Sequence, residues 1–396
     1  MATQTKFVGM TGNEAVANAM KQINPDVIAA YPITPQTDIV QYYSSFVADG
    51  AVDTELITVE SEHSAMSATC GASAAGSRAM TATSSQGLAL MHEILHIASG
   101  DRLPIVMPVV NRAVSAPLNI HCDHSDTMAA LTTGWLQIYS ESAQEAYDNM
   151  IQAIRIAENP KVLLPVMVCY DGFITSHAVD NLQILPDDVV KAFVGQYKPE
   201  RSFFNLKDPT TVGPLVLPDY FSELKYQQAL ATERSNEVIL EVAKEFEKIS
   251  GRKYSFFEEY KMEDAERIVV VLSSTAGTAK AVVDQLRANG EKVGLLKPRV
   301  IRPFPAAELV KALSGAKAVA VMDRADEFSN QGGPLFTEVR AAFYSAQTRP
   351  LMRGYIFGLG GRDTTTREIK KIFADLSDDL KAGRVGQLVS HLDVRV

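Results

Sequence analysis

The stretch VIAAYPITPQT, residues 27–37, begins as a short apolar run and ends in a turn that contains two prolines. The run over 27–30 predicts a buried strand, and a helix is expected to begin near Thr37. Each proline fixes its own φ and removes a backbone donor, so Thr34 between them has little conformational freedom. In open α/β sheets, ligands bind at the carboxyl ends of the strands. The stretch therefore predicts a rigid hydroxyl at a ligand-binding edge, with an ordinary strand-to-helix connection as the alternative.

Strand and helix patterns alternate around this stretch through the first 180 residues or so, which predicts a doubly wound α/β domain. The segment 64–79 is rich in Ala, Gly and Ser. We interpret it as an interface helix whose lack of bulk lets another backbone or a cofactor come close. The expected strands are 27–30, 56–59, 80–83, 104–110 and 163–169, and the expected helices are 14–22, one from 37, 64–79 and 88–98.

The pattern loosens from about residue 181, where repeated prolines break the chain into short pieces before a charged helix near 222–249. We interpret this segment as a connector that wraps rather than as core. A strand at 267–272 and a helix at 279–289 then open a second α/β domain. We therefore expect two domains, residues 1–250 including the connector and residues 251–396.

Composition excludes several classes of function. The 396 residues are 46% hydrophobic and 21% charged, with a formal net charge of −9. This acidic balance argues against a nucleic-acid partner held through phosphate contacts. No apolar run reaches the roughly 18 residues of a membrane span, and the amino terminus shows no secretion-signal pattern. We expect a cytoplasmic protein with no membrane or nucleic-acid partner.

Redox cofactors have no obvious site in this chain. Cys70, Cys122 and Cys169 are isolated from one another and no CxxC pair occurs, so an iron–sulfur cluster is not expected here. A dinucleotide site needs the GxGxxG fingerprint, but residues 273–278 hold one glycine, and 358–361 lack a following acidic residue at the right distance. Any redox chemistry must therefore come from elsewhere.

A metal site is suggested by HCDHSD at 121–126, which concentrates four types of possible ligand in six residues. Catalytic zinc ligands usually come from regular spacing on one helix or from separate elements, whereas this run is expected in a loop. In the structural alternative, Asp123 and Asp126 cap the following helix, and His121 or His124 lines a polar pocket.

A carboxylate and an arginine are expected near Thr34, at the same edge of the sheet. Glu60 and Glu62 follow the apolar strand 56–59, where a charge that is not solvated must be paired or must meet a proton donor. A surface acidic cluster is the alternative. Arg112 ends another strand, and its planar guanidinium can clamp a carboxylate through two hydrogen bonds.

Motifs in a fixed order carry a resemblance that covers nearly the whole chain. They are YPITP at 31–35, SE at 61–62 before the Ala/Gly-rich helix, TSSQGL at 83–88, NRA at 111–113 and DHSD at 123–126. By these motifs the chain resembles the alpha subunits of the pyruvate:ferredoxin oxidoreductases, within the thiamine diphosphate-dependent 2-oxoacid:ferredoxin oxidoreductase family. The resemblance implies a thiamine diphosphate-binding, pyrimidine-type doubly wound domain followed by a transketolase C-terminal-like α/β domain.

The resemblance also implies roles for single residues. By it, Glu62 hydrogen-bonds N1′ of the aminopyrimidine and so promotes the proton transfer that activates the cofactor. Arg112 is implied to hold the substrate carboxylate, and Thr34 to donate a hydrogen bond to substrate oxygens. Asp123 joins Thr34 and Arg112 in the implied substrate site, and no metal ligand is expected. The further implied cofactor contacts are Pro32, Ile33, Ser85 and Gln86.

Two sequence features are absent from this chain, and their absence indicates that other subunits take part. It has no GDG segment for magnesium and diphosphate, and no cluster cysteines. The resemblance implies a beta subunit that shares thiamine diphosphate, a ferredoxin-like delta subunit and a gamma subunit, with Mg²⁺ and [4Fe-4S] clusters on these partners. The implied reaction converts a 2-oxoacid and coenzyme A into acyl-CoA and CO₂, with ferredoxin as electron acceptor.

The substrate is less closely defined. Pyruvate is favoured because the whole pattern resembles the pyruvate branch, but a carboxylate clamp at Arg112 suits any 2-oxoacid. Aromatic 2-oxoacids such as phenylglyoxylate, 2-oxobutyrate and 2-oxoglutarate stay open. A non-catalytic assembly subunit is an alternative of another class, in which Glu62 and Arg112 are spectators.

Overall fold

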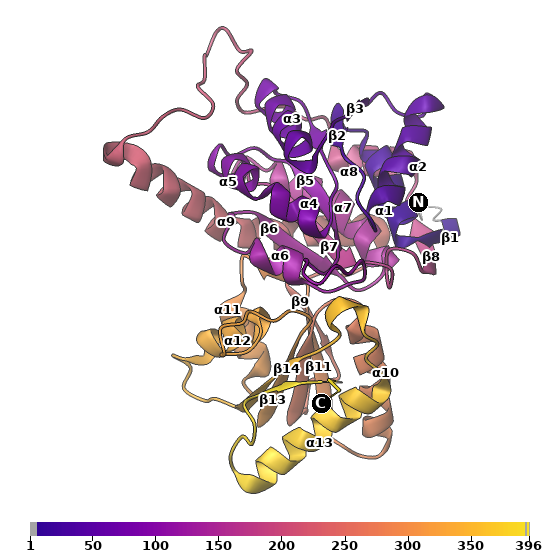
Figure 1. Cartoon of the computed structure of the whole chain (residues 1–396), viewed down its shortest axis with the longest axis vertical. Coiled ribbons are helices and arrows are strands. Elements are labelled where there is room, and N and C mark those ends of the chain that lie inside the picture. The colour runs from indigo at the N-terminus through magenta and orange to yellow at the C-terminus, as the bar shows by residue number, and fades with distance from the viewer. Residues whose placement is uncertain (1–5, 393, 396) are drawn as a thin grey trace.

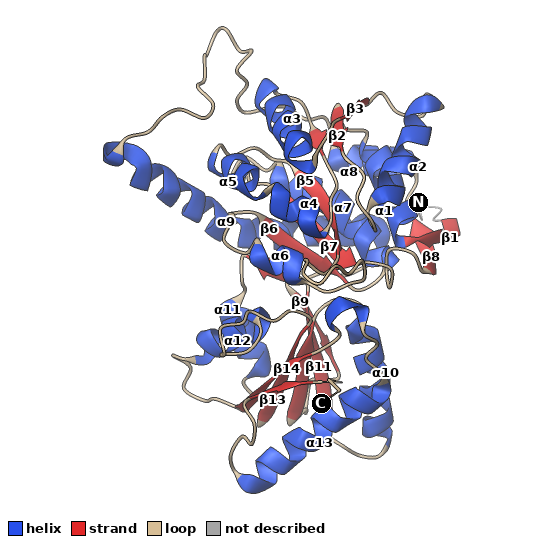
Figure 2. Cartoon of the chain, viewed as in Figure 1, coloured by secondary structure: helices blue, strands red, loops and turns tan. Residues whose placement is uncertain are grey.

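The computed structural model describes residues 6–392 and 394–395. The chain forms two α/β units, which lie one above the other in Figure 1, and each has its own large sheet with helices on both faces (Figure 2). This arrangement agrees with the two α/β domains expected from the alternating pattern. In the part of the chain that the structure describes, every helix is too short or too polar to span a lipid bilayer.

The first sheet has seven strands in the order β12-β6-β7-β5-β4-β2-β3, and all neighbours are parallel except β12 and β6. The strand expected at 27–30 is β2 (Val27–Ala30), as predicted. The other strands of this sheet are β3 (Glu55–Thr58), β4 (Ala79–Met80), β5 (Val106–Asn111), β6 (Leu136–Ser140), β7 (Val166–Asp171) and β12 (Val300–Arg302). A separate antiparallel pair consists of β1 (Lys6–Thr11) and β8 (Val179–Ile184).

Helices cover both faces of this sheet. The small-residue helix begins at residue 62 rather than 64 because the Ser61 side chain caps it, and Gly76 ends it with a φ of 101°. The helix expected over 88–98 is two helices that meet at Met91. On one face lie α1 (Gly12–Ile23), α2 (Thr37–Ala48), α7 (Ala143–Ala157) and α8 (Asp187–Val194), and on the other α3 (Glu62–Ala75), α4 (Ser85–Leu90), α5 (His92–Gly100) and α6 (Ser125–Ala129).

Helix α9 (Pro218–Ser250) revises the expected connector. Val238, Ile239 and Phe246 in its second half are fully buried in the core of the first unit, where the helix packs against α7. They recur at helical spacing and form one apolar face, as in any helix that packs on a core. The first half of α9 instead projects from the body, after a long loop (Figure 1).

The second sheet has six strands in the order β15-β14-β13-β10-β11-β9, parallel except where β9 pairs with β11. Helices α10 and α13 pack on one face, and α11 and α12 on the other. The elements are β9 (Phe257–Tyr260), β10 (Arg267–Val271), α10 (Thr275–Ala288), β11 (Val293–Pro298), α11 (Ala306–Leu313), β13 (Ala318–Asp323), α12 (Pro334–Phe343), β14 (Leu351–Ile356), η1 (Leu359–Gly361), α13 (Thr366–Ala382) and β15 (Val389–His391).

One continuous segment ties the two units together. The chain leaves the second sheet at Pro298 and enters the first sheet as β12 at Val300. Just before this crossing, the buried Lys297 Nζ lies 2.7 Å from Glu141 Oε2 and 2.5 Å from Glu145 Oε1, both of the first unit. A continuous segment that runs from one sheet into the other and a buried ion cluster therefore hold the two units against each other, and the domain boundary expected at residue 250 stays a prediction.

Candidate active site at the edge of the first sheet

Glu62 is the first residue of α3, directly after the N-cap Ser61. A carboxylate is favoured in the first turn of a helix by the helix dipole. The side chain is largely buried, at 7% exposed, and among the described residues none forms a hydrogen bond or ion pair with its carboxylate. Glu60 differs in both respects, because it is exposed and accepts a hydrogen bond from Ser64 Oγ at 2.5 Å. A buried carboxylate without a protein partner is costly, so Glu62 is available to a ligand.

Gly87 gives the Glu62 carboxylate its space. A Cβ atom at residue 87 would lie 2.8 Å from Glu62 Oε1 and 2.5 Å from Thr83 Oγ1. The Thr83 hydroxyl is buried and has no partner among the described residues. Two unpaired polar groups therefore border the same glycine. Both Thr83 and Gly87 lie in the motif at 83–88, which by itself predicted a role for neither residue.

The proline turn and the end of β5 are in direct contact. Arg112 donates from Nη1 to the backbone oxygen of Thr34 at 2.8 Å, and from Nε to that of Asn119 at 3.1 Å. Arg112 is buried and forms no ion pair with a described residue, so its other N–H groups can bind an anion. The Thr34 side chain is exposed. Pro32 is also exposed and Ile33 is half-buried, and their cofactor contacts stay predictions.

Asp126 of α6 connects Arg112 to Ser85. Its Oδ2 accepts the backbone N–H groups of both residues at 3.0 Å, and its Oδ1 accepts Asn111 Nδ2 at 2.8 Å. Burial raises the pKa of Asp126 to about 6, and the hydrogen bonds that it accepts oppose the shift. Burial also lowers the pKa of Arg112, which the Asp126 charge opposes. Asp126 is therefore a positioning residue, a role that its sequence motif alone did not reveal.

Ser85 and Gln86 hold the loop that follows β5. Ser85 Oγ donates to the backbone oxygen of Ala113 at 2.6 Å, and Gln86 Nε2 donates to Ser115 Oγ. Ser85 adopts a φ of 46° at the start of α4. The two side chains thus shape the wall of the site, and their predicted contact with the cofactor stays a prediction.

Asp123 joins this loop to the second unit. Its Oδ1 accepts the Ser125 N–H at 3.0 Å, and its Oδ2 accepts the Gly360 N–H at 3.2 Å. The N-cap residue of α6 is His124, which makes no side-chain cap hydrogen bond, and Asp126 lies inside the helix, so the capping expected of Asp123 and Asp126 is wrong. Asn119 Nδ2 also donates to the Gly360 carbonyl, at 3.0 Å. Because both carboxylate oxygens are used, the structure gives Asp123 a structural task, and its substrate contact stays a prediction.

The HCDHSD segment contributes to a buried ion cluster between the two units. His124 Nε2 lies 2.8 Å from Asp171 Oδ1, and Arg324 Nη1 lies 3.0 Å from Asp171 Oδ2. Burial alone raises the pKa of Asp171, but His124 and Arg324 together lower it well below its usual value. Ligand atoms of Cys122, His124 and Asp171 lie within 4.8 Å of one another, yet Asp171 is already bonded, and burial raises the pKa of the Cys122 thiol.

Part of the predicted site is therefore assembled. Thr34 contacts Arg112 directly, and Asp126 links Arg112 to the turn that leads from Ser85 to the glycine beside Glu62. The hydrogen bonds that join the turn at Ser85 to the end of β5 are accepted by Asp126, which lies in α6 and comes after both in the sequence. Parallel strands place their carboxyl ends at one edge, but which side chains meet there depends on the loops.

Comparisons with known proteins show what the chain is similar to. Residues 18–244 match the family model "Pyruvate flavodoxin/ferredoxin oxidoreductase, thiamine diP-bdg", and residues 265–369 match "Pyruvate:ferredoxin oxidoreductase core domain II". The chain is 57% identical to pyruvate synthase subunit PorA of Thermotoga maritima, over 93% of this chain and 94% of the relative. It is 48% identical to PorA of Methanothermobacter thermautotrophicus (92% and 93%) and 44% identical to ketoisovalerate oxidoreductase subunit VorA of Pyrococcus horikoshii (95% and 95%).

Solved structures share the fold. A 2-oxoglutarate:ferredoxin oxidoreductase from Magnetococcus marinus, determined with 2-oxoglutarate, coenzyme A and succinyl-CoA, superposes with a TM-score of 0.75 at 20% identity, over 94% of this chain and 66% of that chain. A split-gene transketolase superposes with a TM-score of 0.57 at 13% identity, over 95% of this chain and 100% of that chain. The expected fold, a thiamine diphosphate-binding domain followed by a transketolase C-terminal-like domain, is confirmed.

Proposed function

This chain belongs to the pyruvate flavodoxin/ferredoxin oxidoreductase family, and from that premise we propose that it is the alpha subunit of a 2-oxoacid:ferredoxin oxidoreductase. The reaction is the oxidative decarboxylation of a 2-oxoacid with coenzyme A, which yields acyl-CoA, CO₂ and reduced ferredoxin. Relatives that are subunits of pyruvate synthase support this reaction class. The observation that carries the proposal is the buried, unpaired carboxylate of Glu62.

The residues at the sheet edge fit the aminopyrimidine of thiamine diphosphate. Glu62 offers a buried acceptor without a protein partner, and the unpartnered Thr83 hydroxyl lies across Gly87 from it. When bound, the cofactor supplies a nucleophilic carbon and an electron sink for the breaking carboxyl bond. Glu62 would hold the aminopyrimidine at N1′ and move the proton there. A side chain at residue 87 would crowd this carboxylate, which accounts for the glycine.

Arg112 and Thr34 serve the substrate. Arg112 keeps two of its donors on backbone oxygens, which fixes the guanidinium in place, and directs its remaining N–H groups to the substrate carboxylate. The exposed Thr34 hydroxyl, on a turn held by Arg112, donates to the 2-oxo oxygen. A guanidinium fixed in this way favours one substrate orientation and so lowers the entropic part of the barrier.

Other subunits supply what this chain lacks. Its relatives bear subunit names, and the chain contains neither a diphosphate-binding GDG segment nor paired cysteines. We assign Mg²⁺ and the diphosphate end of the cofactor to a beta subunit, and the [4Fe-4S] clusters to a ferredoxin-like delta subunit. A gamma subunit completes the complex, and ferredoxin accepts the electrons.

Pyruvate is the favoured substrate. The PorA relatives are 44–57% identical to this chain, but a VorA relative at 44% shows that chains this similar also occur in a ketoisovalerate oxidoreductase. The Arg112 clamp does not select the side chain of the 2-oxoacid. A panel of pyruvate, 2-oxoisovalerate, 2-oxoglutarate and phenylglyoxylate, with coenzyme A and a one-electron acceptor, identifies the substrate from the ratios of kcat/KM.

Glu62→Gln in the assembled complex tests the function. An amide cannot take part in the proton transfer, so we expect kcat to fall at least about 100-fold while subunit composition is unchanged. Glu60→Gln is the matched control, because Glu60 is exposed and two residues away, and it should leave kcat within a factor of two or so. Normal turnover by Glu62→Gln would mean that this chain is a non-catalytic assembly subunit.

A further inference from the structure

The segment of residues 198–226, here called the arm, leaves the first unit as a long loop and returns along the first turns of α9. In Figure 1 its loop rises beside α3, and the start of α9 projects beyond the body. Nearly every residue from 201 to 227 is exposed. These exposed residues include six large apolar side chains, between 62% and 92% exposed: Phe204, Leu206, Leu215, Leu217, Tyr220 and Tyr226.

Such exposure is unusual for so many large apolar side chains in one segment. Apolar side chains gain free energy when they leave water, and contiguous exposed apolar surface on a folded chain marks an interaction site. At the start of α9, Tyr220, Phe221 and Leu224 are all exposed. Their spacing of one, three and four residues places them on one face of the helix, and Leu224 also lines the hollow beside Asp101 and Arg102. An apolar helix face of this kind is normally covered by other protein.

The root of the arm is fastened to α3 and to the end of α5. Ser202 Oγ donates to the backbone oxygen of Ala75 at 2.6 Å, and the Phe203 N–H donates to that of Ala74 at 3.1 Å. The Gly213 N–H donates to Asp101 Oδ1 at 3.3 Å. The arm is therefore held in place at its base, while its large apolar side chains stay mostly exposed.

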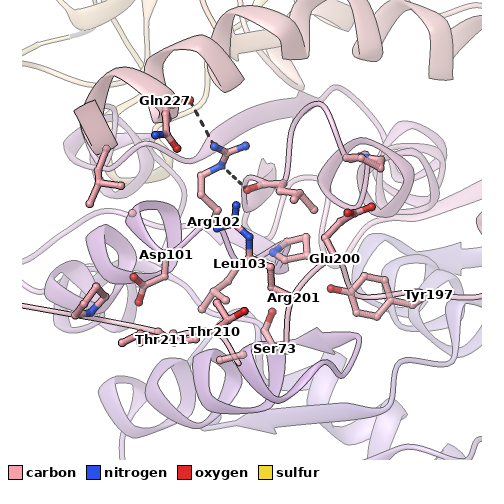
Figure 3. A pocket seen from close by; sticks show the side chains of 18 residues that line it. Ser73, Asp101, Arg102, Leu103, Tyr197, Glu200, Arg201, Thr210, Thr211 and Gln227 are labelled. Atoms are coloured by element: carbon pink, nitrogen blue, oxygen red, sulfur yellow. Dashed lines mark hydrogen bonds between the residues drawn. The ribbon is translucent and has the colours of Figure 1, made fainter. Parts of the chain in front are cut away.

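Figure 3 shows the hollow at this root, a cavity of about 250 Å³. Ser73 of α3, Asp101 and Thr210 of the loop line it. Arg102 extends beside it and donates to the carbonyl oxygens of Leu163, at 3.0 Å, and Gln227, at 3.5 Å. This cavity lies at the opposite end of α3 from Glu62, and we assign it to the arm and not to the active site.

We propose that the arm is a docking surface for the subunit that binds the diphosphate end of the cofactor. The proposal rests on the proposed function, which requires another chain to cover Glu62. Helix α3 starts at Glu62 and carries the root of the arm at Ala74 and Ala75. Its 14 residues span about 21 Å, at 1.5 Å per residue. A domain of ordinary size, with a radius of gyration of about 13 Å, is large enough to cover both ends of α3 at once.

The surface of α3 between Glu62 and the arm is suited to contact with another subunit. Ser67 and Gly71 on the outer face of α3 are exposed and small, and Leu90 and Ile97 beside them are 50% and 42% exposed. The face between Glu62 and the arm thus carries small and apolar side chains together with the exposed pair of His63 and Glu93, whose Nε2 and Oε2 atoms lie 3.8 Å apart. A second copy of this chain could bury the arm, but it has no diphosphate-binding segment, so it would occupy this face without completing the site.

Photo-cross-linking in the intact complex tests the proposal. p-Benzoylphenylalanine is placed at Phe204 or Tyr220, and at Tyr344 as the control, which is 77% exposed in the second unit. The subunit attached after irradiation is identified by peptide mass spectrometry. We expect both arm positions to cross-link to the subunit with the magnesium and diphosphate segment, and Tyr344 not to. A cross-link to a second copy of this chain, to an iron–sulfur subunit, or to nothing overturns the proposal.

Affinity gives an independent readout. The double variant Phe204→Ser with Leu206→Ser should bind that subunit at least tenfold more weakly, with the melting temperature of the isolated chain unchanged, and Tyr344→Ser should bind normally. Unchanged affinity of the double variant overturns the docking surface. A complex that decarboxylates 2-oxoacids while its arm cross-links elsewhere overturns the docking surface alone. A cross-link to the expected subunit in a complex inactive with every 2-oxoacid supports the docking surface and overturns the function alone.

Discussion

At the scale of single residues, what distinguishes the site is which polar groups the protein leaves unpaired. Arg324 is matched by Asp171, and Lys297 by Glu141 and Glu145. Among the described residues, Arg112 and Glu62 have no charged partner. The buried Arg299 has none either, but each of its three nitrogens donates to a neutral group of the protein. Buried charges are normally paired, so unpaired ones at one sheet edge indicate ligand-binding groups.

Arg112→Lys tests the substrate clamp. Lysine keeps the charge but loses the planar fork that binds backbone and carboxylate at once. Loss of a charge-assisted hydrogen bond of about 1.5–3 kcal/mol predicts a rise in KM for the 2-oxoacid of about 10- to 100-fold, measured by steady-state kinetics on the complex. Arg349→Lys, at an exposed arginine of the second unit, should leave KM unchanged. An unaltered KM for Arg112→Lys would rule out the clamp.

At the scale of elements, α3 packs on the core of the first unit and, in our proposal, also contacts another subunit. Its inner face packs Ala65, Met66 and Thr69 into the body, and its outer face presents Ser67 and Gly71. A Cβ at Gly71 would meet no atom within 4 Å, so none of the described residues requires a glycine there. Glycine in a helix costs about 0.5–1 kcal/mol relative to alanine, and the close contact with another chain that we propose would account for that cost.

Gly71→Leu separates the two tasks. In the isolated chain we expect the free energy of unfolding to rise by about 0.5–1 kcal/mol from helix propensity, measured by urea denaturation. In the complex the added side chain overpacks the contact by about 1–3 kcal/mol, so the affinity for the partner subunit should fall at least about fivefold. Gly315→Leu, at another exposed glycine with free space, is the control. Equal affinities for the two variants would mean that α3 is not an interface helix.

At the scale of the whole molecule, buried ion clusters at the contact between the two units keep the site edge in place. Asp171 at the end of β7 binds His124 of the first unit and Arg324 of the second. Asp126 and the loop after β5 lie in the same region as His124, so a shift of the second unit would disturb the support of Arg112.

Asp171→Asn should destabilise the chain by about 3 kcal/mol at pH 7, since it leaves Arg324 buried without its counter-charge. The folded-state pKa of Asp171 lies below the unfolded value of about 3.9. Its contribution is therefore present above that unfolded value and is lost as the pH falls through the folded pKa. Urea denaturation from pH 8 to pH 3 should show a constant difference from the wild type down to about pH 4 and a smaller one below.

The exposed pair Lys381 and Asp378 provides the control for this prediction. Asp378→Asn should change stability by no more than about 0.5 kcal/mol across the same pH range. A difference between Asp171→Asn and the wild type that persists unchanged at pH 3 would contradict the assigned ion cluster.

The sequence by itself determined the α/β class, the strand at 27–30, the order of the motifs and the family. Local patterns suffice for these, because strands, helices and proline turns depend on neighbouring residues. Whether Asp123 serves substrate or structure could not be predicted, since its partner Gly360 lies 237 positions away. Only the tertiary structure decided that Asp126 supports Arg112 and that Gly87 makes room for Glu62. It also showed the apolar arm free of the core, because pairing and burial depend on contacts between distant segments.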